Sequence, residues 1–451
     1  MDIYRPLCRH VVIPLWNWYS QNSYLDYMDY LIKSQYANSD EIKKKQWEMM
    51  KRMLDHAYGN TAFYRKRFEA AGIDPQEIQT WEDYEKVPIL RKQDVREHGG
   101  SLYAGAYDKY SRFITSGSTG TPLEGYRNKA CQEWKKACVL RCNMWGRYRL
   151  GERVYCLYGN PPEKLDWRLR LRRKLYTREE FLDSLSLTEE SMMRFADLMK
   201  KRPPSLVWGH AHNMYLFASF LEKRGIRDIR PKGMFSAGMV LHPWERKKVE
   251  EVFQCEFMDR YGCEEFGIIA AECRAREGLH INTDDLIVEF LNKEGRPVKP
   301  GELGHVVVTD LMNYVMPFIR YKMEDVAVPS AHKCSCGRTQ PLIEKIEGRL
   351  ADFILTPDGR MISGISLTDH FGANIPGVGQ IQIVQEKIDE LTLNIVKDDF
   401  FSPETQATIE QLVRRYFGEA MKYRCEFMKN IEQEASGKYR FTVCKVKNPY
   451  I

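Results

Sequence analysis

The chain has 451 residues, of which 43% are hydrophobic and 29% are charged, and its formal net charge is +6 at pH 7. This length allows two or three domains with a sizeable core. The small net charge argues against a nucleic-acid partner. No apolar run is long enough to span a bilayer, so no transmembrane helix is expected.

Residues 1–60 are expected to form helices rich in Trp and Tyr. Asn38 and Ser39 precede a run rich in Glu, Lys and Met, which predicts a capped helix of about 20 residues. The apolar patch Val11–Trp18 is short, is interrupted by Pro14 and has no small-residue cleavage site after it, so no signal peptide is expected. The twelve cysteines are mostly scattered, which is typical of thiols packed in a protein of the reducing cytoplasm.

A loop rich in glycine and hydroxyl residues follows Phe113 and Ile114, which are expected to end a strand. The loop reads Thr115-Ser116-Gly117-Ser118-Thr119-Gly120-Thr121-Pro122. Glycine lets successive N–H groups face one side, and Ser and Thr add short hydroxyl donors, so such a loop can wrap an anion. It lacks the Gly-Lys-Ser/Thr of the Walker pattern, and a plain flexible loop is the alternative interpretation.

Strand and helix patterns then alternate along the chain. Strands are expected at 153–158 and 205–209 and helices at 214–224 and 243–253, which favours an α/β domain with mainly parallel sheets. From about 285 to 356 the pattern becomes β-rich.

The C-terminal hundred residues have the character of a small α+β lobe. The pattern predicts a lobe built from strands at 381–384, 391–395 and 439–446 and a helix at 403–417. The expected domains are therefore residues 1–350 and 351–451.

A basic and apolar stretch lies between Lys164 and Arg178. Its centre reads Trp167-Arg168-Leu169-Arg170-Leu171-Arg172-Arg173-Lys174-Leu175. A solvated surface hairpin or helix is the favoured interpretation. The alternative is contact with an anionic membrane or an acidic polymer, because basic charge beside apolar neighbours suits such an interface.

Five more motifs follow in a specific order. They are Phe235–Met239, Asp259–Gly267, Met316–Asp325, Glu347–Asp352 and Ser436–Arg440. With the loop, this ordered set resembles the adenylate-forming ligases, and within them the phenylacetate–CoA ligase branch with its capsular-polysaccharide (CapK-like) relatives, over roughly residues 45–445. The resemblance implies an α/β fold with a large N-terminal adenylation domain, a β-rich subdomain and a small mobile α+β lobe that hinges near Asp352.

The resemblance also implies a nucleotide site. The residues that match the cradle of the ATP phosphates are Ser116, Gly117, Ser118, Thr119, Gly120 and Thr121. Tyr261, followed by Gly262, matches the residue that stacks on adenine, and Glu265 matches the acidic Mg²⁺ ligand, where a hard cation needs carboxylate oxygen. Asp325 matches the acceptor of both ribose hydroxyls, and Arg349 matches a second ribose or phosphate contact.

The same resemblance assigns catalysis to Lys438 of the mobile lobe, acting with Glu265. A flexible ammonium group can neutralise charge that develops between the carboxylate and the α-phosphate. The substrate carboxylate is expected near Ser236-Ala237-Gly238 and the turn at 261–267, with aromatic walls that include Trp208 and Phe266.

Two departures from the family pattern are visible. Glu264 stands where a Ser or Thr is usual, and Lys322-Met323-Glu324-Asp325 replaces Arg-Thr-Gly-Asp. Glu264 adds negative charge, so it must face away, be paired or help to hold metal.

A metal site is expected from Cys334 and Cys336 together with Cys273 and His280. Three sulfurs and one imidazole form a complete tetrahedral set for structural zinc, and the resemblance includes relatives that carry zinc at comparable positions. The nearby His332 competes with His280 as the fourth ligand.

The resulting hypothesis is an ATP- and Mg²⁺-dependent ligase that activates a carboxylic acid as acyl-AMP, releases pyrophosphate and passes the acyl group to coenzyme A. One alternative acceptor is a sugar or amine, in polysaccharide or natural-product biosynthesis without coenzyme A. A catalytically inactive, zinc-bound scaffold is the other alternative. A cytoplasmic location is expected, while peripheral membrane contact and a homodimer stay open.

Overall fold

The computed structural model describes residues 4–105, 110–114, 123–158, 167–183, 187–349, 353–363, 367, 371, 375–432 and 439–446. The chain divides into two compact units. The first comprises Met1–Arg153, Asp166–Arg178 and Met258–Lys345, and the second comprises Val154–Leu165, Glu179–Phe257 and Ile346–Ile451. The expected domain boundary at residue 350 stays a prediction.

The first unit begins with helices. They are α1 (Tyr4–Leu7), η1 (Cys8–Val12), α2 (Ile13–Ser20), α3 (Tyr24–Ser34), α4 (Ser39–Asn60), α5 (Ala62–Ala71), η2 (Pro75–Glu77), α6 (Trp81–Tyr84), α7 (Lys92–Leu102), α8 (Lys129–Trp145), α9 (Trp167–Arg172) and η3 (Arg173–Thr177). The predicted cap of α4 is confirmed, since the Asn38 side chain accepts a hydrogen bond from the Asp40 N–H at 3.0 Å. The basic stretch near 170 is helical, which decides between the two local structures expected for it.

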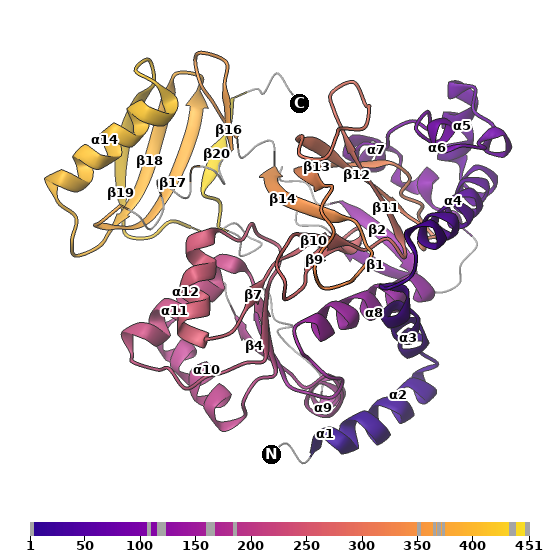
Figure 1. Ribbon diagram of the computed structural model, residues 1–451, viewed down its shortest axis with the longest axis horizontal. Helices are drawn as coiled ribbons and strands as arrows, with labels where there is room; N and C mark the ends of the chain where they lie inside the picture. The colour runs from indigo at the N-terminus through magenta and orange to yellow at the C-terminus, as the bar shows by residue number, and fades with distance from the viewer. Residues whose placement is uncertain are drawn as a thin grey trace. The chain divides into compact units, whose positions relative to one another are not determined.

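A seven-stranded sheet forms the β-rich part of this unit (Figure 1). Its strands, in spatial order, are β11 (Leu286–Leu291), β12 (Gly304–Asp310), β13 (Tyr321–Ser330), β14 (Leu342–Arg349), β10 (Leu279–Ile281), β9 (Gly267–Glu272) and β8 (Arg260–Cys263). A separate antiparallel hairpin pairs β1 (Tyr110–Ile114) with β2 (Glu124–Asn128), so the expected strand end at Ile114 is confirmed. All seven residues of β12 are buried, including the polar His305, Thr309 and Asp310 that flank its three central valines.

The second unit contains a five-stranded sheet in the order β4-β3-β5-β6-β7. Its strands are β3 (Val154–Tyr158), β4 (Glu179–Asp183), β5 (Leu206–Gly209), β6 (Gly233–Ser236) and β7 (Phe257–Met258). Strand β3 runs parallel to β4 and β5, and β5 runs parallel to β6. The helices between these strands are α10 (Glu189–Lys201), α11 (Ala211–Lys223) and α12 (Pro243–Phe253). The expected alternation of strands and helices is therefore present, and it builds the predicted parallel sheet.

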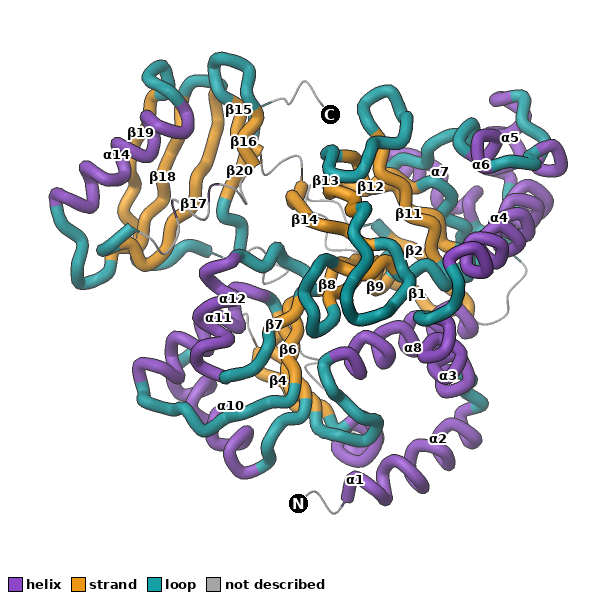
Figure 2. The backbone as a smooth tube through the Cα atoms, viewed as in Figure 1, coloured by secondary structure: helices purple, strands orange, loops and turns teal. Residues whose placement is uncertain are grey.

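The C-terminal lobe belongs to this second unit. A four-stranded sheet in the order β19-β18-β17-β20 carries helix α14, which runs alongside its strands in Figure 2. The elements of the lobe are β15 (Phe353–Leu355), β16 (Met361–Ser363), β17 (Val378–Lys387), β18 (Glu390–Lys397), α14 (Pro403–Phe417), β19 (Lys422–Met428) and β20 (Thr442–Cys444). Ile381 and Ile383, two residues apart on β17, and Ile409 and Val413, four residues apart on α14, are buried in one core. The predicted α/β class with a small α+β lobe is confirmed.

Candidate functional site

Tyr261 on β8 and Glu265 in the turn between β8 and β9, two of the expected nucleotide residues, lie close together in the chain. Glu264, Glu265 and Phe266 form this turn; Glu265 is buried, whereas Glu264 is exposed. The Glu264 side chain therefore projects into solvent, and which of the three expected outcomes holds for this departure stays a prediction. Gly262 has a clear physical role, because a Cβ at this position would lie 2.2 Å from the Gly267 carbonyl oxygen.

Asp325 on β13 meets Tyr261 on β8. The Tyr261 hydroxyl donates a hydrogen bond to Asp325 Oδ2 at 2.8 Å. Desolvation raises the pKa of the neighbouring Cys263 thiol well above its usual value, and the negative charges of Glu265 and Asp325 add to the rise. Tyr261, Glu265 and Asp325 thus share one small, partly desolvated region of the first unit.

The β1–β2 hairpin contacts the same turn. The Arg127 guanidinium on β2 donates to the Glu264 carbonyl oxygen, and it lies 4.3 Å from the ring centroid of Phe113 on β1. The strand pair carries the glycine- and hydroxyl-rich loop, but residues 115–122 lie outside the described part of the chain. Arg127 was missed by sequence analysis, since nothing local distinguishes it from the other arginines.

In the second unit, the expected carboxylate-binding segment lies at the carboxyl end of β6. Ser236 is fully buried, and the Ala237 N–H donates to the Gly209 carbonyl oxygen at 2.9 Å. Gly238 has φ of +71°, a conformation that other residues rarely adopt. In open α/β sheets, ligands commonly bind beyond the carboxyl ends of parallel strands.

Aromatic side chains gather at this edge of the sheet. The ring of Tyr158, at the end of β3, lies 5.5 Å from Trp208 and 4.5 Å from His210. Trp208 was expected near the substrate; Tyr158 and His210 were missed, although their positions at strand ends are a usable signal. Phe266, the other expected wall residue, is buried and packs against Phe318 and Tyr321 in the first unit.

Four expected contributions lie wholly or partly outside the described residues. Ser116, Gly117, Ser118, Thr119, Gly120 and Thr121 lie outside the described residues, as does Lys438. Arg349 ends β14, but its side chain lies outside the description. The hinge position Asp352 also falls outside it. These assignments stay predictions.

The four predicted zinc ligands come together in the first unit. The ligand atoms of Cys273, His280, Cys334 and Cys336 all lie within 4.8 Å of one another. Cys273 Sγ lies 3.6 Å from Cys334 Sγ, and Cys336 Sγ lies 3.4 Å from His280 Nε2. Tetrahedral zinc with its usual bond lengths places ligand atoms about 3.5–3.8 Å apart, so the donor set and its spacing fit this ion.

The protonation state of His280 also suits a ligand. Burial lowers the pKa of His280 to about 4, and the positive charge of Arg338 adds to this effect, so the imidazole is neutral near pH 7. The competing ligand is excluded by position, because the half-exposed His332 ring lies 2.9 Å from Glu277 and outside the cluster.

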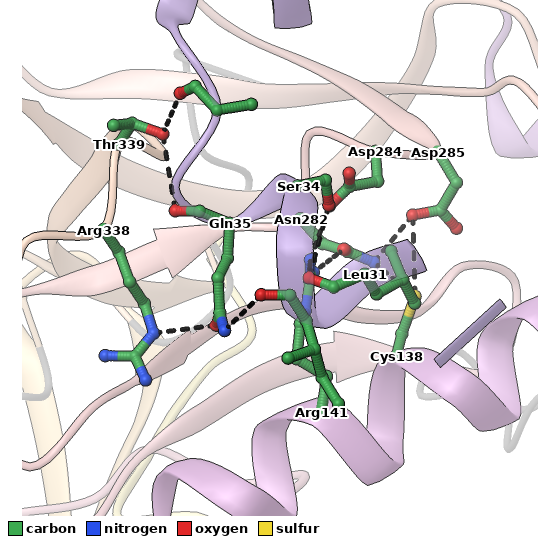
Figure 3. A network of polar contacts seen from close by, with 12 residues as sticks. Leu31, Ser34, Gln35, Cys138, Arg141, Asn282, Asp284, Asp285, Arg338 and Thr339 are labelled. Atoms are coloured by element: carbon green, nitrogen blue, oxygen red, sulfur yellow. Dashed lines mark hydrogen bonds and ion pairs between the residues drawn. The ribbon is translucent and has the colours of Figure 1, made fainter. Parts of the chain in front are cut away.

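A polar network anchors the loop that carries Cys334 and Cys336 (Figure 3). Arg338 Nε donates to Gln35 Oε1 at 3.0 Å. The Trp145 indole donates to the same oxygen at 2.9 Å. The Thr339 N–H donates to the Gln35 carbonyl oxygen at 3.1 Å. The ring of Trp145 in turn lies 5.4 Å from His280. The ligand loop is thereby tied to the end of α3 and to α8.

Solved structures define the class of this fold. The 2-hydroxyisobutyryl-CoA ligase in its postadenylation state with R3-HIB-AMP has a TM-score of 0.75 at 20% identity and covers 91% of each chain. ATP-bound MatB from Rhodopseudomonas palustris has a TM-score of 0.52 at 14% identity, over 73% of this chain and 66% of that one. At these identities the likeness shows the fold, which is that of the adenylate-forming CoA ligases.

Sequence comparison narrows the relationship. The phenylacetate-coenzyme A ligase of Thermus thermophilus is 27% identical over 326 residues, which are 70% of this chain and 72% of that protein. Protein CapK of Staphylococcus aureus is 20% identical over 408 residues, 86% of each chain. Residues 354–445 match the family model of the CapK C-terminal domain. The resemblance inferred from the motifs is confirmed, and so is the enzyme class, because the named relatives include acid–CoA ligases.

Proposed function

We propose that this protein activates a carboxylic acid with ATP and transfers the acyl group to coenzyme A. The carboxylate attacks the α-phosphorus of ATP, which gives acyl-AMP and pyrophosphate. The thiol of coenzyme A then attacks the acyl carbon, which gives the thioester and AMP. The observation that carries this proposal is the grouping of Tyr261, Glu265 and Asp325 around one turn of the chain.

Each member of this group has a chemistry that suits a nucleotide. Asp325 offers carboxylate oxygens to vicinal ribose hydroxyls. It also accepts the hydrogen bond of the Tyr261 hydroxyl, which fixes the orientation of that aromatic ring for stacking on a base. Glu265 is buried at the turn, where a carboxylate suits a hard divalent cation. Bound Mg²⁺ would neutralise triphosphate charge at that carboxylate.

Ser236-Ala237-Gly238 and the aromatic residues Tyr158 and Trp208 are assigned to the acid. Close backbone approach at Gly238 leaves room for a carboxylate, and two large rings favour an apolar or aromatic acyl group. Zinc held by Cys273, His280, Cys334 and Cys336 is assigned a structural role, because four protein ligands leave no open position.

A second acceptor class is favoured by one specific observation. Residues 354–445 match the CapK C-terminal domain, and the name of that family does not specify coenzyme A as the acceptor. A sugar or amine acceptor therefore stands as the alternative to the thiol, within the same adenylation chemistry.

A pyrophosphate-release assay across aryl, fatty, hydroxy and amino acids tests the proposal. Wild-type protein should release pyrophosphate with at least one class of acid. Glu265→Gln should reduce the rate by about a hundredfold, because it removes a charge that the reaction needs. Glu264→Gln is the matched control, since that side chain is exposed, and it should retain activity.

The acceptor and the scaffold alternative are separated by two further measurements. AMP release that depends on coenzyme A supports the thiol, whereas release that needs a sugar or amine supports the alternative. The scaffold becomes the better explanation if no acid gives pyrophosphate and ATP does not bind. Loss of turnover in Lys438→Ala would count against the scaffold.

A further inference from the structure

The N-terminal helices expose a continuous row of large apolar side chains. Leu7, Val11, Leu15, Trp18 and Tyr19 recur at helical spacing along α1, η1 and α2, and all are exposed, with Trp18 at 78% and Leu15 at 59%. The opposite side of the same helices is buried against the first unit. That side carries Cys8, Ile13 and Asn17.

A second row continues the pattern on α9 and η3. Trp167, Leu171 and Leu175 follow one another at intervals of four residues, and each is exposed, Trp167 at 69%. Four-residue spacing places them along one side of a helix. Single exposed apolar residues are ordinary, but a row on each of two helices needs an explanation.

The two rows belong to neighbouring segments of the first unit. The Tyr4 hydroxyl donates to the Leu175 carbonyl oxygen at 3.0 Å, and the Cys8 thiol donates to the same oxygen at 3.3 Å. The rings of Trp16 and Tyr176 lie 5.6 Å apart. Figure 1 shows α1, α2 and α9 together in this part of the unit. We call the exposed sides of these helices, from Leu7 to Tyr19 and from Trp167 to Leu175, the amphipathic face.

The charges of this face have one sign. Neither Tyr4–Ser20 nor Trp167–Arg178 contains Asp or Glu, and six of the twelve residues in the second segment are Arg or Lys. Arg9 and Lys174 are exposed beside the apolar rows. Arg172 lies 5.6 Å from the Trp16 ring centroid, so a cation also stands beside the aromatic residues.

This combination favours an anionic bilayer over a second copy of the chain. Tryptophan and leucine rows flanked by cations match the boundary between lipid tails and acidic headgroups. A two-fold contact between copies would instead bring the same basic surface against itself. No helix in the described residues is long and apolar enough to cross a membrane, so the contact would be peripheral.

We propose that the amphipathic face docks the protein onto anionic lipid surfaces. The apolar rows enter the headgroup region, while Arg9, Lys174 and their neighbours meet lipid phosphates. This inference does not depend on the proposed reaction.

Co-sedimentation of the full-length protein with vesicles tests the proposal. One set contains phosphatidylcholine alone, and the other contains phosphatidylcholine and phosphatidylglycerol in equal amounts. The protein should sediment with the anionic vesicles, and high salt should weaken this binding because exposed charges are screened.

Paired variants separate the two contributions. Trp18→Ser should weaken binding to anionic vesicles by about tenfold, through lost apolar burial, whereas Phe400→Ser, at another exposed aromatic residue, should not. Lys174→Glu should weaken it by about fivefold or more, whereas Lys201→Glu, on α10, should not. All four positions are exposed, so folding should persist; thermal unfolding of each variant checks this.

Three results would overturn the proposal. The first is equal binding to neutral and anionic vesicles, and the second is no binding to either. The third is a dimer that Trp18→Ser converts to a monomer while vesicle binding is unchanged, which would make this face a contact between copies.

Discussion

At the scale of single residues, Asp285 stands out in the buried charge network of the first unit. Lys135 Nζ lies 2.8 Å from Asp310, and Arg141 Nη1 lies 2.5 Å from Asp284. Within the described part of the chain, Asp285 forms no ion pair of its own. Burial raises its pKa to about 7, against the opposing charge of Lys135.

This shift predicts how stability depends on pH. The folded pKa of Asp285 is raised above its unfolded value of about 3.9, so the folded state binds more protons between these values and stability falls as pH rises through that window. Asp285→Asn cannot ionise, and its side-chain oxygen can still accept from Asn282 Nδ2, now 2.7 Å away. The melting temperature of the variant relative to wild type should therefore rise from pH 5 to pH 8, as measured by scanning calorimetry.

Asp26→Asn on the exposed surface of α3 is the control, and its offset from wild type should be the same at both pH values. An Asp285→Asn offset that also stays constant would show that Asp285 is ionised throughout this range.

At the scale of elements, the β8–β9 hairpin requires glycine at position 262, because its backbone packs too closely there for any side chain. A Cβ on Gly262 would meet the Gly267 carbonyl oxygen at 2.2 Å, so Gly262→Ala must displace backbone. We expect a lower melting temperature and at least tenfold slower pyrophosphate release, because the turn holds Glu265. Gly99→Ala, in helix α7 with no atom within 4 Å of the new Cβ, should instead stabilise by about 0.5–1 kcal/mol.

The cluster of Cys273, His280, Cys334 and Cys336 predicts a metal-dependent element. Cys334→Ser should lower the zinc content of purified protein from one ion per chain and reduce the melting temperature, because the loop then loses a ligand. Cys425→Ser, a half-buried cysteine outside the cluster, should change neither property. Mass spectrometry of the metal content of each purified protein tests this prediction. An unaltered zinc content in Cys334→Ser would contradict the assignment of Cys334 as a zinc ligand.

At the scale of the whole molecule, the C-terminal lobe packs against helices α11 and α12 within the second unit. The ring of Tyr439 stacks on His212 at 4.4 Å, and His212 Nδ1 lies 2.9 Å from Glu245. The Tyr439 hydroxyl donates to the Ile381 carbonyl oxygen of β17. Tyr439 directly follows Lys438 in the sequence, and we infer from this adjacency that Tyr439 positions the proposed catalytic lysine.

Tyr439→Ala should therefore slow pyrophosphate release by about tenfold, because an aromatic pair and its buried area are lost. Tyr439→Phe keeps the stacking and should recover most of the rate. Tyr423→Ala, at a half-buried tyrosine on β19, is the control. Steady-state rates at saturating acid and ATP make the comparison, and equal rates in all three variants would remove Tyr439 from any positioning role.

Local patterns in the sequence predicted much of the secondary structure. The apolar runs at 153–158 and 205–209, the Asn38 cap and the helix at 403–417 were predictable, because burial periodicity and capping act between near neighbours. The cysteine and histidine set was also predictable, since few residue types bind zinc.

Only the tertiary structure revealed the hydrogen bond between Tyr261 and Asp325 and the one from Arg127 to the Glu264 carbonyl oxygen. It also showed that His332 lies outside the metal cluster, beside Glu277. It also showed that Leu15 and Trp18 face solvent, where their sequence alone is equally compatible with a core helix. The physical reason is the same in each case: these outcomes depend on packing between segments far apart in the chain, and no local pattern encodes which surfaces will meet.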